Sequence, residues 1–330
     1  IYFSEKFKNK FIIERLINNF LNEKNSFVFE SVEKGKIKGR FTIFGKNPDK
    51  IWELNNNKVI SIINNKKKNL KIKPYAFLNK LIENFNFITP RSLPPICSLL
   101  SGFFSYDIIR YIENIPNSCK DDLKLPDVRL MRPRSVIIHD NLKKKIHFIV
   151  NCYSDEKIGN YKKKFDSIKN DLINLKQITV NKHSYIKNKI YKKKFFKIQS
   201  NMTKKYFKTM VLKAKKEIKM GNIFQVVLSQ RFKTQLTKSP LEIYKKLRVT
   251  NPSPFMYFFN FSDFQIIGAS PEILVRLRNG KVTIRPIAGT RPRGKNKKMD
   301  KFYQKDLLKD KKELAEHLML LDLGRNDVGK

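Results

Sequence analysis

The sequence predicts an α+β fold in which mostly antiparallel β-sheets form a sandwich-like core with flanking helices. Three observations lead to this class. Apolar and polar residues alternate in pairs of strand-length runs joined by short turns, as in antiparallel hairpins. Amphipathic segments of helical period stand between blocks of these runs rather than after every strand. The 330-residue chain is also 41% hydrophobic and 12% aromatic, so it can bury a substantial core.

The first region of the chain is expected to be rich in β-structure. Alternation predicts strands within residues 26–48, 51–54, 58–62, 101–105 and 135–153, the last a hairpin that turns at Asp140 and Asn141. Helical spacing marks residues 74–85, 106–116 and 155–175. A lysine-rich polar stretch then runs to about Ser200. We place a boundary there, between domains of residues 1–200 and 201–330.

The second region is expected to interleave with the first. Thr203 has the position of a helix N-cap, and Gly221 follows the end of the same helix. Strand-like patterns cover residues 222–232, 255–270 and 272–287, the last two as hairpins that turn at Ser262-Asp263 and Asn279-Gly280. Helices are predicted in residues 239–251 and 310–323.

The formal net charge of +41 raises the alternative of a basic nucleic-acid-binding protein. The lysines are scattered through every segment among Ile, Asn, Phe and Tyr, and no recognisable module interleaves basic and aromatic residues. We therefore interpret the charge as solvated surface, with only weak, salt-sensitive binding to polyanions.

The three cysteines indicate a reducing environment. Cys97, Cys119 and Cys152 are far apart and have no metal-ligand spacing, so neither a disulfide framework nor a zinc site is expected. No window approaches the roughly 20 apolar residues of a membrane span. A cytoplasmic protein that binds no membrane is the expectation.

Residues 286–295, "PIAGTRPRGK", end an alternating strand in an elbow rich in Pro, Gly and Arg. One interpretation is an ordinary turn, since Pro fixes φ and Gly permits positive φ. The other is an anion pocket made by the N–H groups of Ala288, Gly289 and Thr290 with the Thr290 hydroxyl, because Gly lets a ligand approach the backbone closely.

The last predicted helix carries Glu313 and Glu316, which are three residues apart and so project from one face. In a chain this basic, they form either a surface pair that faces lysines or a Mg²⁺ site. Mg²⁺ typically takes one or two carboxylates and keeps positions for water and an anionic substrate.

Five motifs of the second region occur in one order: "GNIFQVVLSQRF", "NPSPFMYFF", "GASPEILVR", "PIAGTRPRG" and "ELAEHLMLLDLGRND". Together they resemble the chorismate-binding domain of anthranilate synthase component I. The stretches "FESVEKGKIKGRFTIFG", "GFFSYDIIRYIE" and "LPDVRLMRPRSVIIHD" are similar to the N-terminal region of that family. The resemblance covers nearly the whole chain.

The resemblance implies a two-step conversion of chorismate to anthranilate and pyruvate. Ammonia, supplied by a glutamine amidotransferase subunit, adds at C2 as the C4 hydroxyl leaves, and pyruvate is then eliminated. The alternative within this fold is an aminodeoxychorismate synthase, many of which carry a lysine at the position of Ala288. A lysine there can attack C2 itself and alanine cannot, so Ala288 favours anthranilate.

The resemblance also implies the roles of site residues. Glu316, with Glu313 nearby, matches the Mg²⁺ site that holds the ring carboxylate. Glu272 matches the general acid for the departing hydroxyl. Gln225 stands where water-adding relatives carry a lysine base, and an amide cannot deprotonate water. Thr290 is counted with these catalytic residues, and the substrate-binding residues are Ala288, Gly289 and Thr290.

Feedback inhibition by L-tryptophan is implied by two further motifs. "FES", with Glu30 and Ser31, matches the inhibitor motif of the family, and "NPSPFM" supplies Pro254, Phe255 and Met256 to the same pocket. Glu30 or nearby backbone is expected to take the amino group, and Arg40 to lie near the carboxylate. The alternative is that the first motif is only a strand end and the second only a loop that stops a helix.

The family also has a downstream segment with a second Glu pair, a catalytic His, and a Tyr and an Arg for the substrate carboxylates. None of these matches a position up to Lys330. The sequence is therefore expected to be C-terminally truncated and inactive by itself.

Overall fold

The computed structural model describes residues 1–6, 12–33, 36–37, 39–85, 87–153, 155, 161–180 and 197–329. The chain divides into two compact units, Ile1–His183 with Tyr244–Lys330, and Ser184–Ile243. These units do not follow a boundary at residue 200, because strands from both sides of that position pair in one sheet. Whether the two predicted regions divide regulation from catalysis stays a prediction.

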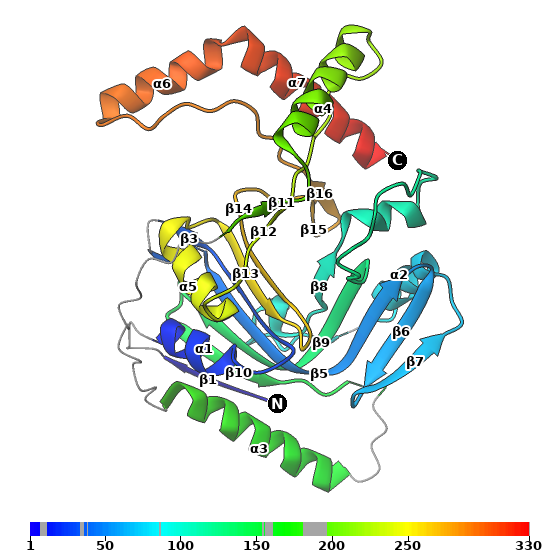
Figure 1. Cartoon of the computed structure of the whole chain (residues 1–330). Coiled ribbons are helices and arrows are strands. Elements are labelled where there is room, and N and C mark those ends of the chain that lie inside the picture. The colour runs from blue at the N-terminus through cyan, green and yellow to red at the C-terminus, as the bar shows by residue number, and fades with distance from the viewer. Residues whose placement is uncertain are drawn as a thin grey trace. The chain divides into compact units, whose positions relative to one another are not determined.

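Among the described residues, ten strands form one antiparallel sheet in the first unit (Figure 1). Its main path is β1 (Tyr2–Lys6), β10 (Lys145–Val150), β9 (Val128–Asp140), β5 (Phe41–Asn55), β2 (Ser26–Glu30), β13 (Phe255–Asn260) and β14 (Gln265–Ser270). Off this path, β5 pairs with β6 (Lys58–Ile63), β6 with β7 (Lys66–Leu70), and β9 with β8 (Ser101–Phe104). The predicted α+β class with interleaved regions is confirmed, since β13 and β14 complete the sheet that the N-terminal strands begin.

Strand β5 is longer than the two short runs that alternation predicted. It continues from Phe41 to Asn55 beside β9, with a register shift between Pro48 and Lys50. Proline has no N–H to donate to the ladder, so the sheet accommodates it in a bulge. The alternation breaks there, which is why the sequence pattern suggested separate strands.

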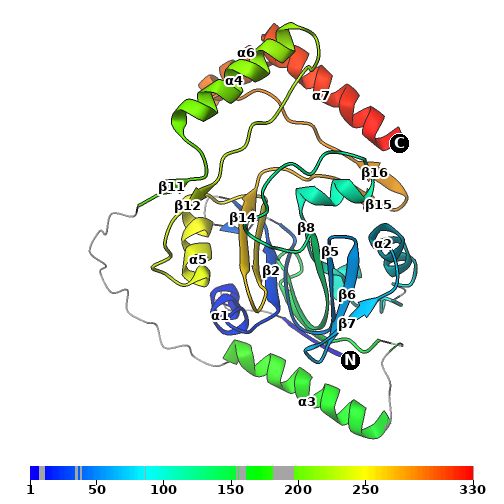
Figure 2. The same cartoon turned by 45° about the vertical axis from the view of Figure 1, so that its right-hand side comes forward.

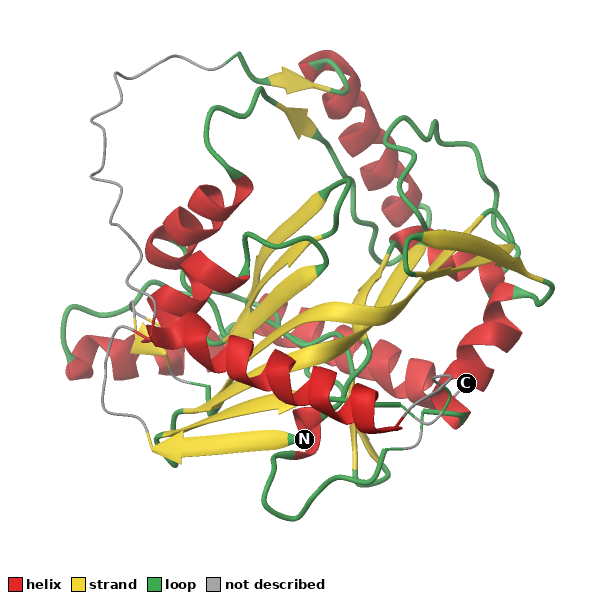
Figure 3. Ribbon diagram, turned by 90° about the horizontal axis from the view of Figure 1, so that it is seen from below, coloured by secondary structure: helices red, strands yellow, loops and turns green. Residues whose placement is uncertain are grey.

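Two helices cover the sheet beside β1 and β10. Helix α1 (Ile12–Phe20) buries an apolar stripe that ends in Phe20, whose ring packs edge-on against Phe44 of β5 at 5.7 Å. Helix α3 (Tyr161–Val180) contacts α1, β10 and β9, and Asn19 of α1 donates to the Ile178 carbonyl at 3.1 Å. Figure 3 shows α3 crossing in front of the sheet.

The other described elements of the first unit are short or flank the sheet. They are α2 (Pro74–Glu83), the 3₁₀ helices η1 (Pro95–Cys97) and η2 (Tyr106–Tyr111), the pair β3 (Val32–Glu33) and β4 (Lys36–Ile37), the pair β15 (Arg276–Arg278) and β16 (Lys281–Thr283), α6 (Lys297–Lys309) and α7 (Lys311–Gly329). The predicted hairpin turn at Asn279-Gly280 is confirmed, and both residues have positive φ, 51° and 72°. No described helix is long and apolar enough to cross a membrane.

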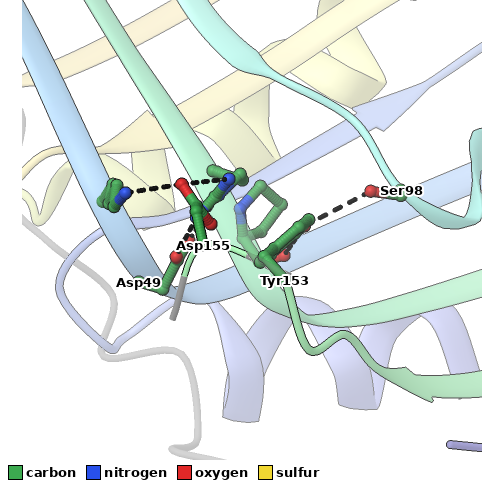
Figure 4. A network of polar contacts seen from close by, with 7 residues as sticks. Asp49, Ser98, Tyr153 and Asp155 are labelled. Carbon is green, nitrogen blue, oxygen red and sulfur yellow. Dashed lines mark hydrogen bonds and ion pairs between the residues drawn. The ribbon is translucent and has the colours of Figure 1, made fainter. Parts of the chain in front are cut away.

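A partly buried polar network lies at β5 and β9. Arg132 bonds Asp49 and Asp155, and Tyr153 donates to the Pro133 carbonyl at 3.0 Å. Figure 4 shows this network around Asp49, Ser98, Tyr153 and Asp155. Since Asp49 is 4% exposed, Arg132 supplies the charge compensation that a buried carboxylate requires.

The second unit holds β11 (Gln199–Ser200), α4 (Lys204–Lys219) and β12 (Phe232–Lys233). The predicted N-cap is confirmed, because the Thr203 hydroxyl accepts from the Tyr206 N–H at 3.2 Å. The prediction of a strand over residues 222–232 is wrong except at its end. Only Phe232 pairs, with Ser200, and a strand without a partner leaves its ladder groups unsatisfied.

Helix α5 (Pro240–Thr250) joins the two units in sequence, and its residues from Tyr244 on belong to the first. There it packs on the β2–β13 part of the sheet, where the rings of Tyr244 and Phe258 are 5.5 Å apart. Figure 2 shows α5 alongside these strands.

Candidate active site

The elbow lies directly against the first turn of α7. Gly289 has a φ of +74°, and a Cβ at this position would come within 2.8 Å of Leu307 Cδ1 and 2.9 Å of Glu313 Oε2. Only glycine combines this backbone conformation with so close an approach. The elbow therefore brings the backbone of the predicted anion pocket close to Glu313, a predicted metal ligand.

Arg291 ties the elbow to both C-terminal helices. Its Nε donates to Asp306 of α6 at 2.6 Å and its Nη2 donates to Asp310 at 2.6 Å. Asp310 in turn accepts the N–H groups of Lys312 and Glu313 at 3.0 and 3.2 Å, so it caps α7. The hydrogen bond from Arg291 holds the pKa of Asp310 below its ordinary value. This network fixes the start of α7 relative to the elbow.

Glu313 and Glu316 both lie on α7, with the Glu313 side chain 19% exposed and Glu316 partly exposed. Among the described residues, Glu313 forms an ion pair with Arg291, whose Nη1 lies 4.0 Å from Oε1. Within the described ranges, no group of three or more His, Cys, Asp or Glu side chains is arranged to hold a metal ion. Two hard carboxylate donors on one helix face nevertheless fit Mg²⁺, which takes one or two carboxylates and completes its shell with water and substrate oxygens.

Replacing Gly289 by alanine tests the contact between the elbow and α7. We expect the added Cβ to displace Glu313 and to destabilise the junction between the elbow and α7. Gly280→Ala is a matched control, because Gly280 also has a positive φ, of 72°, but no atom stands near its missing Cβ. Both variants carry the backbone cost of about 1–2 kcal/mol for a left-handed residue. Chemical denaturation should give a larger loss of unfolding free energy for Gly289→Ala than for Gly280→Ala. Equal losses would contradict the contact.

The two predicted inhibitor motifs are neighbours in space. Strands β2 and β13 pair antiparallel with Glu30 opposite Met256, and the Val32 N–H donates to the Ser253 carbonyl at 2.9 Å. The structure therefore brings together "FES" and "NPSPFM", as the sequence predicted. Met256 is buried, whereas Phe255 and Pro254 are exposed.

Arg40 precedes β5 and bonds the end of β9. Its Nε and Nη2 donate to Asp140 Oδ2 at 3.2 and 3.1 Å, and its guanidinium lies 4.6 Å from the centre of the Phe41 ring. Burial alone would raise the pKa of Asp140, but hydrogen bonds from the Lys143 N–H and Arg40 hold it below its ordinary value. With 46% of its side chain exposed, Arg40 still presents a cationic surface.

Comparison with known proteins gives these contacts their context. A family model described as chorismate binding enzyme matches residues 25–330. The chain belongs to this family.

Relatives of this chain include anthranilate synthase component 1 of Acetivibrio thermocellus, 41% identical over 320 residues, and that of Cereibacter sphaeroides, 41% identical over 314 residues. These alignments cover 96% and 93% of this chain but 64% and 62% of the relatives. A crystal structure of anthranilate synthase component I from Streptococcus pneumoniae superposes with a TM-score of 0.73 at 34% identity, over 89% of this chain and 62% of that one. The chain thus spans less than two thirds of the length of these relatives.

The other predicted catalytic residues of this chain lie in two places. Glu272 follows β14, and its N–H and carbonyl both bond the Ser270 hydroxyl, at 3.3 and 2.9 Å. This closed turn fixes the Glu272 backbone and leaves its carboxylate partly exposed. Gln225 is exposed in the second unit, outside any strand.

Ala288 is partly exposed in the elbow, and Thr290 is exposed with its carbonyl accepting from Arg291 at 3.1 Å. The structure therefore joins the elbow with Glu313, while the joint action of Glu272 and Gln225 stays a prediction.

Two arginines that bond residues of the two candidate sites, Arg291 beside the elbow and Arg248 beside Glu30, were given no role in the sequence analysis. Arg291 was part of the quoted elbow but had no role, although an Asp directly before α7 is a typical N-cap partner. Arg248 and Tyr244, four residues apart on one face of α5, both bond Glu30. That spacing, directly before the "NPSP" motif, was the available signal.

Proposed function

We propose that this chain carries the chorismate-converting part of anthranilate synthase component 1. Chorismate and ammonia give anthranilate, pyruvate and water. The observation that supports this most is the contact between Gly289 and Glu313, in a chain 41% identical to proteins of that name. This contact places the backbone N–H donors of the elbow next to a carboxylate of α7. An anionic substrate bound beside a divalent cation requires both kinds of group.

Chorismate presents carboxylates to the elbow. The N–H groups of Gly289 and Thr290 and the Thr290 hydroxyl are the donors that we assign to them. Glu316 and Glu313 would hold Mg²⁺, which when bound polarises a carboxylate. The hydrogen bond from Arg291 to Asp310 at the start of α7 holds these groups in fixed positions. Little reorganisation is therefore needed when charge moves in the ring of the substrate.

The amination step needs an acid and a nucleophile that requires no base. Ammonia attacks C2, the ring double bonds shift, and the C4–O bond breaks as Glu272 donates a proton to the departing hydroxyl. Gln225 cannot take a proton from water, so it does not activate water as a nucleophile. Ala288 cannot attack C2 itself, so neither residue provides a competitor to ammonia at C2. Loss of the C2 proton with cleavage of the C3–O bond then releases pyruvate and gives the aromatic ring.

The proposal includes two partners and a location. A glutamine amidotransferase subunit supplies the ammonia, and L-tryptophan binds at the β2–β13 seam as a feedback inhibitor. The three cysteines are unpaired, which supports the reducing cytoplasm as the site of the reaction.

Incorporation of labelled ammonia tests this function. The complete polypeptide, incubated with chorismate, Mg²⁺ and ¹⁵N-ammonium, should yield ¹⁵N-anthranilate and an equal amount of pyruvate by mass spectrometry. Glu272→Gln should retain chorismate binding and lose turnover. A product that keeps the enolpyruvyl group and carries the amino group at C4 would assign the chain to aminodeoxychorismate synthesis instead.

A further inference from the structure

A cavity of about 650 Å³ lies on the sheet at β5, β6 and β7. Figure 1 shows these three strands side by side. The cavity has the size of a small-molecule site, which is typically roughly 300–1,000 Å³. Its lining residues do not belong to the elbow, to α7 or to β2 and β13, so no function described above uses this cavity. They include Trp52 of β5, Ser61 and Ile63 of β6, and Lys66, Lys68 and Leu70 of β7.

The register of the three strands places these side chains on one face of the sheet. Ser61 stands opposite both Trp52 and Lys68. Ile63 stands opposite Lys66. Residues directly opposite one another share a face, so β7 forms a wall of the cavity and β5 and β6 form its floor.

The turn between β6 and β7 keeps this register. It consists of Asn64 and Asn65, which have positive φ of 49° and 62°, as in a type I′ hairpin turn. Successive residues of a strand point to opposite faces. Lys66 and Lys68 therefore point to the cavity, whereas Lys67 between them points to the other face of the sheet.

The floor is apolar and offers one hydroxyl. Trp52 is buried, with its ring 6.3 Å from the Phe77 ring of α2 and 5.9 Å from the Arg132 guanidinium. Ile63 is exposed and presents apolar surface to the cavity. Ser61 is buried, and its hydroxyl bonds no other group in the part of the chain that the structure describes. A ligand that enters can therefore bury a ring and bond this hydroxyl.

The wall is cationic. Lys66 and Lys68 are both exposed, and within the described ranges neither forms an ion pair with a carboxylate. Lys50 also lines the cavity, but it is already bound to Asp155 at 2.6 Å. Residues two apart on a strand are separated by roughly 7 Å. Two uncompensated ammonium groups at this spacing, beside an apolar floor, attract a ligand with more than one negative charge.

We propose that this cavity binds a small aromatic anion. The flat ring of the ligand lies on Trp52 and Ile63. Its phosphate or carboxylate oxygens accept hydrogen bonds from Lys66, Lys68 and Ser61. A bare cationic surface attracts any anion by charge alone, whereas this cavity adds a preference for anions that carry a ring. The proposal concerns binding and does not depend on the proposed conversion of chorismate.

Titration of the whole chain with three probes tests the site. Phenyl phosphate carries a ring and a dianion, inorganic phosphate carries the charge without the ring, and benzyl alcohol carries the ring without the charge. Trp52 is the single tryptophan, so its fluorescence, excited where the probes do not absorb, reports binding in the cavity. We expect phenyl phosphate to give a saturable change and, by calorimetry, to bind at least about tenfold more tightly than inorganic phosphate, because its ring is buried. Benzyl alcohol should give no saturable change.

Phthalate, which carries two carboxylates on the same ring, distinguishes the two anionic groups. Tighter binding of phthalate than of phenyl phosphate would identify the ligand as an aromatic carboxylate, and the reverse would identify it as an aromatic phosphate. Saturable binding of either probe supports the site.

Substitutions on β7 supply matched variants. Lys66→Met and Lys68→Met should each weaken phenyl phosphate binding at least about fivefold, because each removes a charged donor. Lys67→Met removes the same charge from the other face, where Lys67 lies near enough to Asp263 to interact with its charge. It should bind phenyl phosphate within about twofold of the unmodified protein. All three lysines are exposed, so the variants should fold, and a thermal melt checks this.

Three outcomes overturn the proposal. The absence of a saturable change with both phenyl phosphate and phthalate would show that the cavity takes no such ligand. Equal affinities for phenyl phosphate and inorganic phosphate would indicate a surface that binds any anion, polyanions included, by charge alone. Binding that is undiminished in Lys66→Met and Lys68→Met, or weakened equally in Lys67→Met, would place the probe outside the cavity.

Discussion

Replacing Glu316 by alanine in the complete polypeptide should lower the rate of anthranilate formation by at least about 10²-fold, the loss typical when one charge-stabilising group leaves an active site. Glu316 is half of the carboxylate pair on α7 that fits Mg²⁺. The fold should be preserved, because Glu316 is partly exposed. Glu313→Ala should have a smaller effect, since Glu313 is expected to act through water.

The measurement is a Mg²⁺ titration of the rate, together with calorimetric binding of Mg²⁺ and a thermal melt. Asp322→Ala is the control, because Asp322 lies on the same helix and bonds Arg325 at 2.7 Å on the exposed surface. It should leave both metal binding and rate near those of the unmodified protein. Full activity of Glu316→Ala without added metal would show that Glu316 is not a ligand of the metal site.

Replacing Arg132 by methionine should destabilise the first unit by about 3–5 kcal/mol, the cost of leaving a buried ion-pair partner uncompensated. The Arg132 Nε donates to Asp49 Oδ1 at 2.9 Å, and Asp49 is 4% exposed. The guanidinium also lies 3.9 Å from the centre of the Tyr153 ring, so the substitution removes a cation–π contact as well.

Lys50→Met is the matched control. Lys50 bonds Asp155 at 2.6 Å, but the Asp155 side chain is 50% exposed. Loss of this ion pair should therefore lower the free energy of unfolding by no more than about 1 kcal/mol. Burial alone would raise the pKa of Asp155, yet hydrogen bonds from Arg132 and Lys50 lower it to about 2. This carboxylate is therefore ionised at neutral pH in the unmodified protein.

Urea denaturation followed by tryptophan fluorescence measures both variants, because Trp52 is the single tryptophan of the chain and lies 5.9 Å from the Arg132 guanidinium. If the urea midpoint of unfolding of Arg132→Met equals that of Lys50→Met, another group must compensate the charge of Asp49.

Local features of this fold were predictable from the sequence. The turns at Asp140 and at Asn279-Gly280, the Thr203 cap and the last helix depend on neighbouring residues, and they appear as expected. The elbow was recognisable for the same reason, because Gly289 needs its positive φ whatever lies beside it.

Features that depend on distant partners were not predictable in the same way. The apolar pattern of residues 222–232 describes a strand, but it forms one only where Ser200 offers a partner. The partners of Glu30 come from α5, more than two hundred positions along the chain. No periodicity near Glu30 shows them, so this buried ion pair could not be predicted from the sequence.

The most direct test of the central claim is the fluorescence of anthranilate. The complete polypeptide with chorismate, Mg²⁺ and ammonium should produce the fluorescence of 2-aminobenzoate at a rate that falls when Mg²⁺ is chelated. Chorismate that is consumed without this fluorescence, or fluorescence that appears equally in Gly289→Ala and Glu316→Ala, would contradict the assignment of the elbow and α7 as the site of the reaction.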